Sequence, residues 1–134
     1  MLAGMRRSVT TSEAPAAIGP YSQAVRHGGL LWCSGQLGLD PVSGTLVAGG
    51  TAAEARQAMA NLDAICRAAG TSLTHALRCT IYLVDLADFS RVNEIYRDSF
   101  QEPYPARATV QVSALPKGGR VEIDAVVAMP DTRT

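Results

Sequence analysis

The stretch that decides the fold runs from residue 51 to residue 84 and reads TAAEARQAMANLDAICRAAGTSLTHALRCTIYLV. Its first part repeats apolar side chains at helical spacing, which predicts an amphipathic helix. Thr51 and Glu54 have the spacing of a capping box at its start. Gly70 is a stop signal, because glycine adopts the left-handed conformation at low cost. Residues 76–84 then alternate apolar and polar side chains, which predicts a strand.

Upstream of this helix the sequence predicts short strands joined by loops. Residues 6–11, 24–26 and 30–34 are strand candidates. A Gly-Gly pair separates the last two and supplies the positive φ angles of a tight hairpin. The segment before the helix is rich in glycine, so we expect a loop there with a short strand at residues 45–47.

Downstream, a second helix is expected to begin after Asp85 or Asp88, since both are good N-cap residues. Prolines 103 and 105 are expected to end it. Residues 107–112 and 121–129 are the last two strand candidates. The order β-β-β-α-β-α-β-β predicts an α+β fold with one mixed sheet and two helices packed on one face.

Length and composition restrict the class of protein. The 134 residues fit a single domain over residues 1–134, and 47% hydrophobic with 18% charged residues is a globular composition. Twelve basic residues balance twelve acidic ones without a basic run, so no nucleic-acid partner is expected. No apolar run is long enough for a membrane helix. Three widely spaced cysteines give neither a zinc site nor a disulfide framework, which favours the cytoplasm.

The last strand candidate carries two carboxylates, Glu122 and Asp124. They stand at positions i and i+2 and therefore point to the same face. Two carboxylates there could perform acid–base chemistry, or they could be part of a solvated strand face. The apolar residues around them favour a partner or a task for these charges. This face of the sheet has no predicted helix over it, so we expect a second subunit to cover it.

Four other residues are candidates for a binding site. Arg107 opens a strand after a proline-rich entry, and its guanidinium could hold a carboxylate or form a surface salt bridge. Asn93 lies beside the apolar stripe of the second helix, so its amide needs a hydrogen-bond partner. Tyr21 could present its hydroxyl to a pocket or be an ordinary half-buried tyrosine. Gly35 could allow a ligand or another backbone to approach closely.

Several segments from Ala14 to Ala128 form a pattern when they are taken in order. They are Ala14–Ala24 (APAAIGPYSQA), Ser34–Gln36 (SGQ), Asp88-Phe89 with Val92-Asn93 and Tyr96, Pro105–Arg107 (PAR), and Leu115–Ile123 (LPKGGRVEI). The pattern resembles the RidA/YjgF family of reactive intermediate (imine) deaminases. None of these motifs is specific alone, but their combination is.

The resemblance implies a chorismate-mutase-like α+β fold and a homotrimer with its sites in clefts between subunits. It implies hydrolysis of the small molecules 2-iminobutanoate and 2-iminopropanoate, with their enamine tautomers, to 2-oxo acids and ammonia. It implies no cofactor and no metal. Alternatives are a binding module for small metabolites such as 2-oxo acids, a chaperone-like protein and a ribonuclease. The zero net charge argues against the ribonuclease.

The resemblance also assigns residues. Arg107 matches the arginine that binds the substrate carboxylate, and Glu122 matches the glutamate that positions the attacking water. The further substrate-binding residues it implies are Tyr21, Gly35, Phe89, Asn93 and Thr109. Phe89 and Asn93 of one subunit are expected to face Arg107 of the next.

One dipeptide departs from the pattern of the family. The best-known members have Ser-Cys after the arginine, whereas this chain has Ala108-Thr109. Thr109 still offers its backbone amide, and its hydroxyl is a new donor. We therefore expect the reactivity of this pocket toward thiol-modifying agents to be lost.

Overall fold

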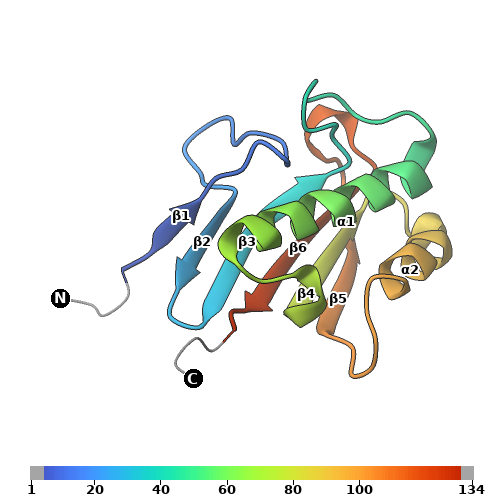
Figure 1. The fold of residues 1–134 in the computed structure, drawn as a ribbon. Coiled ribbons are helices and arrows are strands. Elements are labelled where there is room, and N and C mark those ends of the chain that lie inside the picture. The colour runs from blue at the N-terminus through green and yellow to red at the C-terminus, as the bar shows by residue number, and fades with distance from the viewer. Residues whose placement is uncertain (1–4, 131–134) are drawn as a thin grey trace.

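The computed structural model describes residues 5–130, and the two ends of the expected 1–134 domain lie outside that range. A six-stranded sheet carries two helices on one face (Figure 1). The strands are β1 (Arg7–Val9), β2 (Ala24–His27), β3 (Leu30–Leu37), β4 (Ala76–Leu83), β5 (Ala106–Gln111) and β6 (Val121–Ala128). The helices are α1 (Gly50–Ala69) and α2 (Phe89–Arg97).

The order of the strands across the sheet is β1-β2-β3-β6-β4-β5. Only β4 and β5 pair in parallel, and the other neighbours are antiparallel. The last strand, β6, therefore inserts between β3 and β4 (Figure 1). The predicted order of elements and the mixed sheet with helices on one face are confirmed.

The core lies between the sheet and α1. On β6, Val121, Ile123 and Val127 are fully buried toward the helices, whereas Glu122 and Asp124 point to the other face. This is the alternation that the sequence predicts. The helix contributes a stripe of fully buried side chains at helical spacing, namely Ala55, Ala58, Leu62 and Ile65. Each large apolar side chain buried in this way stabilises the fold by about 1.5–3 kcal/mol.

The start of α1 differs from the expected capping box. Gly49, in the left-handed conformation, is the N-cap residue, and no side chain caps the helix. The Thr51 hydroxyl instead donates to Asp88 Oδ2 at 3.0 Å. The buried Glu54 carboxylate accepts from the Arg120 N–H at 2.8 Å. The capping prediction is wrong because tertiary partners occupy both side chains.

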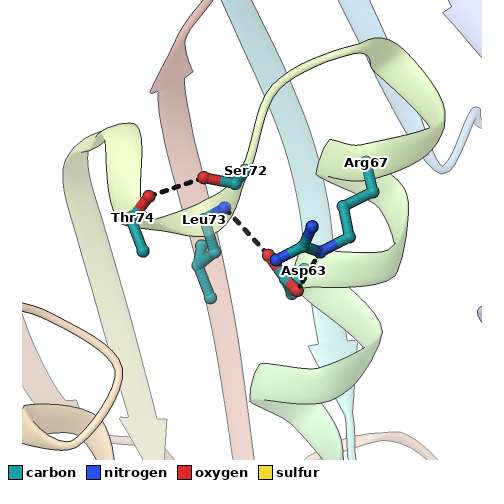
Figure 2. A network of polar contacts seen from close by, with 5 residues as sticks. All are labelled: Asp63, Arg67, Ser72, Leu73 and Thr74. Atoms are coloured by element: carbon teal, nitrogen blue, oxygen red, sulfur yellow. Dashed lines mark hydrogen bonds and ion pairs between the residues drawn. The ribbon is translucent and has the colours of Figure 1, made fainter.

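The end of α1 agrees with the sequence. Gly70 has a φ of 95°, and the Thr71 N–H donates to the Cys66 carbonyl at 3.0 Å. Asp63 then ties the helix to the turn that leads into β4, since its two oxygens accept from Arg67 Nε at 2.7 Å and from Leu73 N at 3.0 Å (Figure 2). Asp63 therefore fastens the turn between α1 and β4 to the helix.

Two other local predictions are wrong. Residues 45–47 form no strand, because only the isolated bridge between Leu39 and Leu46 joins the two sides of this loop. Helix α2 ends at Arg97, well before the prolines, because hydrogen bonds within residues 94–100 close a turn there. Phe100 still packs in the core from outside the helix.

No helix between residues 5 and 130 covers the other face of the sheet. Trp32 on β3 is 48% exposed there, and Tyr82 and Glu122 are partly exposed. None of the helices within residues 5–130 has the length and apolarity needed to cross a membrane.

Candidate functional site

Arg107 lies on β5 and points to the face that the helices cover. Its register partner is Cys79, which is fully buried on that face. Arg107 Nη1 donates to Asn93 Oδ1 at 2.7 Å. The guanidinium carbon lies 5.4 Å from the ring centroid of Phe89 and 4.9 Å from that of Tyr96. Two aromatic rings and one amide of α2 thus fix the guanidinium.

Within the described residues, no carboxylate pairs with this guanidinium. Across residues 5–130 the single ion pair joins Arg67 to Asp63, on the outer side of α1. A recess of about 350 Å³ opens beside Arg107 and is lined by Asn93, Tyr96, Arg97, Tyr104, Pro105 and Arg107. A fixed and unpaired cation at a recess is suited to bind an external anion in a fork. We call this the arginine half-site.

Thr109 stands two residues after Arg107 and points to the same face. Its hydroxyl oxygen is buried without a hydrogen-bond partner in the described chain, and so is that of Tyr96. Burial raises the pKa of the Tyr96 phenol, so this group stays neutral. Unpaired buried hydroxyls are costly. Tyr96 lines the recess beside Arg107, whereas Thr109 lies outside its lining.

Glu122 lies on β6, between Leu37 of β3 and Tyr82 of β4, and points to the uncovered face. It lines a cleft of about 650 Å³. The other lining residues are Pro15, Ala16, Ile18, Tyr21, Gln23, Ser34, Gly35, Gln36, Leu37, Leu39, Pro116 and Lys117. Burial raises the pKa of the Glu122 carboxyl, and the charge of Asp124 raises it further. We call this the glutamate half-site.

Gly35 leaves the space that the Glu122 carboxyl group occupies. A Cβ built on Gly35 would lie 2.8 Å from the Glu122 carboxyl carbon, inside van der Waals contact. The strand pairing shifts register between Cys33 and Gln36, which marks a bulge at this point of β3. The missing side chain and the bulge together bring the β3 backbone against the carboxylate.

Tyr21 lines the cleft from a loop and is 54% exposed. Its hydroxyl accepts a long hydrogen bond of 3.4 Å from the Ile18 N–H. The buried Gln23 amide fixes this loop, since its Nε2 donates to the Pro15 carbonyl at 2.7 Å and its Oε1 accepts from the Thr11 N–H at 2.8 Å. The tyrosine is therefore held at the cleft by an ordered path of the backbone.

The residues expected in one site fall into two groups within the chain. Tyr21, Gly35 and Glu122 meet on the uncovered face, whereas Arg107, Phe89, Asn93 and Thr109 lie on the helix-covered side. The expectation that Phe89 and Asn93 face the arginine of another subunit is wrong. The register of β5 points Arg107 at α2 of its own chain.

Two residues of these half-sites, Tyr96 and Lys117, have no predicted role in the sequence analysis. Tyr96 belongs to the family pattern but has no predicted role in the site. Phe89, Asn93 and Tyr96 nevertheless share, at spacings of four and three, the helix face that meets Arg107. That spacing was a usable signal. No comparable spacing in the sequence predicts that Lys117 lies at the cleft. Its position there comes from a left-handed backbone conformation with a φ of 58°.

Asp124 lies outside the cleft lining. Its Oδ1 accepts from the Thr80 N–H at 3.0 Å and its Oδ2 from the Tyr82 hydroxyl at 2.9 Å. No group of three or more His, Cys, Asp or Glu side chains in the described range is placed to hold a metal ion.

A family model described as Endoribonuclease L-PSP matches residues 11–129. The chain belongs to this family, the RidA/YjgF family. The 2-iminobutanoate/2-iminopropanoate deaminase of Bos taurus is 54% identical over 122 residues, which cover 91% of this chain and 89% of that protein. The family prediction and the α+β fold are thereby confirmed.

Two solved structures of RidA/YjgF proteins extend the comparison. RidA from the Antarctic bacterium Psychrobacter is 48% identical, with a TM-score of 0.88 and coverage of 92% of this chain and 99% of that one. E. coli TdcF, solved with bound serine, is 38% identical with a TM-score of 0.86 and the same coverage. The likeness to the RidA/YjgF family therefore extends through the sheet and both helices.

Proposed function

We propose that this protein hydrolyses small 2-imino acids, such as 2-iminobutanoate and 2-iminopropanoate, to 2-oxo acids and ammonia. The observation that carries the proposal is Arg107, a partly buried guanidinium that an amide and two rings hold without a carboxylate partner in the described chain. The name of the Bos taurus relative supports the same reaction. The serine in TdcF carries the same α-carboxylate group that a 2-imino acid does.

The two half-sites divide the reaction between them. The Arg107 fork binds the carboxylate and orients the adjacent C=N carbon. Glu122 takes a proton from water while the water oxygen bonds to that carbon. The carboxyl returns this proton to the imine nitrogen, which gives a carbinolamine. Glu122 then carries the proton of the carbinol hydroxyl to the amine nitrogen, the C=O bond forms as the C–N bond breaks, and ammonia leaves. Burial raises the pKa of Glu122, which brings its basicity closer to neutral pH.

We infer further that each complete site forms between two subunits of a homotrimer. Arg107 and Glu122 of one chain lie on opposite sides of the same sheet, so one chain does not bring them to one substrate. The uncovered face, with Trp32 half exposed, is the surface that a second copy would cover.

We propose a cytoplasmic location, since the three cysteines are free and buried. The neutral net charge supports small molecules, not nucleic acid, as the partners. We expect the reaction to proceed without a cofactor, because imine hydrolysis needs only a group that binds the substrate carboxylate and a base that activates water.

The test is a coupled assay in which an amino-acid oxidase or threonine dehydratase generates imines and semicarbazide traps those that remain. The wild-type protein should accelerate imine decay, and Glu122→Gln and Arg107→Lys should each lose at least about tenfold of this activity. Arg67→Gln is the control, because Arg67 lies on the outer side of α1 and should leave the rate unchanged. Tight binding of 2-oxobutanoate with no acceleration of any imine would instead identify a binding module.

A further inference from the structure

A second carboxylate accompanies Glu122 on the uncovered face. Asp124 lies two residues further along β6 and points to the same side. The rise of a strand places two such residues roughly 7 Å apart. Asp124 does not line the cleft, and the reaction proposed above gives it no task.

The Asp124 carboxylate is held in place from β4. Thr80, which stands opposite Asp124, donates its backbone N–H to Oδ1 at 3.0 Å. Tyr82, which stands opposite Glu122, donates its hydroxyl to Oδ2 at 2.9 Å. The tyrosine thus reaches diagonally from the position of one carboxylate to the other. Asp124 therefore carries its negative charge at a fixed place beside Glu122.

Within residues 5–130, no cation beside Glu122 offsets the negative charge of Asp124. Lys117 lines the same cleft, but its Nζ donates to the Gly44 carbonyl at 3.0 Å, away from β6. The Arg120 side chain extends toward Gly50 at the start of α1. The other titratable groups that face Glu122 are the phenols of Tyr21 and Tyr82. Burial raises the pKa of the Tyr82 phenol, so this group is neutral at pH 7 and Asp124 is the fixed charge that Glu122 experiences.

We propose that Asp124 is a positioning residue for Glu122, whose fixed charge makes the Glu122 carboxyl hold a proton more readily and so serve as the proton carrier of the reaction. The proposal rests on the function proposed above. Glu122 has to accept a proton as the C–O bond forms and return it to nitrogen, and then carry the hydroxyl proton to nitrogen as the C–N bond breaks. A carboxylate beside a like charge accepts that proton more readily. After burial, the charge of Asp124 is indeed the second cause that raises the pKa of Glu122.

The test compares Asp124→Asn, which removes the charge at equal size, with Asp124→Glu, which keeps it. We expect the acid limb of the kcat/KM profile against pH to move down by on the order of one pH unit in Asp124→Asn. Asp124→Glu should keep the limb close to its wild-type position. A uniform loss of activity in Asp124→Asn with an unmoved limb would overturn the proposal, since a purely structural role predicts that result.

A titration that needs no activity separates this proposal from the proposed function. Carbon-13 labelling of the five glutamates allows the Glu122 carboxyl resonance to be followed by NMR, and Glu122→Gln assigns it. The Glu122 midpoint should fall in Asp124→Asn even if no imine is hydrolysed. If Asp124→Asn does not fold, Tyr82→Phe replaces it. Tyr82→Phe frees one oxygen of Asp124 to turn away, so the Glu122 midpoint should fall by a smaller amount. An unchanged midpoint in the folded variant would refute the coupling.

Discussion

Arg107 and Glu122 lie on opposite faces of one sheet. Arg107 is in register with the buried Cys79 and meets α2, whereas Glu122 is in register with Tyr82 on the face without helices. β4 carries both of these register partners, and its side chains alternate between the two faces. A substrate that contacts both groups therefore needs two chains, and this requirement leads to the first prediction.

Arg107→Ala and Glu122→Gln should each be inactive alone but should restore activity when they are assembled together. In a trimer with sites between subunits, a site is intact when one chain supplies Glu122 and the next supplies Arg107. Random assembly of equal amounts gives about one quarter of the wild-type sites. The measurement is imine hydrolysis after the two variants are unfolded, mixed and refolded. A mixture as inactive as either variant refolded alone would place the whole site within one chain.

The opposite placement of these residues also marks the limit of what the sequence could predict. The alternation along residues 121–128 predicts which side chains of β6 are buried, because it depends only on the strand itself. The direction of Arg107 depends on the parallel pairing of β5 with β4, which is a long-range contact. The capping prediction failed for a similar reason, since Asp88 and Arg120, far away in sequence, bind Thr51 and Glu54.

Gly35→Ala should reduce kcat/KM by roughly 10- to 100-fold, because the new Cβ would displace the Glu122 carboxylate by about an ångström. Gly35 has no positive φ, so the substitution should leave the thermal midpoint nearly unchanged. The matched control is Gly29→Ala, where a Cβ has open space. Equal activity of the two variants would contradict the close approach of Gly35 to Glu122.

Asn93→Asp should lower activity more than Asn93→Ala does. The alanine only frees the Arg107 guanidinium, which should raise KM by about tenfold through lost orientation. The aspartate would place a carboxylate 2.7 Å from Nη1 and neutralise the cation that the substrate needs. Steady-state kinetics should therefore give the larger rise in KM for Asn93→Asp. The opposite order would mean that Arg107 does not bind the substrate carboxylate.

Glu122→Gln should stabilise the folded protein near neutral pH. Burial and Asp124 raise the pKa of Glu122 above its ordinary value of 4.5, so the folded state binds more protons than the unfolded state at pH values between the two. Stability therefore falls as pH rises through this window. Glutamine carries no charge, so the Glu122→Gln variant does not lose this stability as pH rises. Thermal unfolding should give Glu122→Gln the higher midpoint at pH 7, and the difference should vanish well below pH 4.5, where the carboxyl is protonated in both states. Glu94→Gln is the control, since Glu94 is exposed on α2 and should change little at either pH. A Glu122→Gln midpoint below that of the wild type at pH 7 would mean that the assembly supplies Glu122 with a stabilising cation.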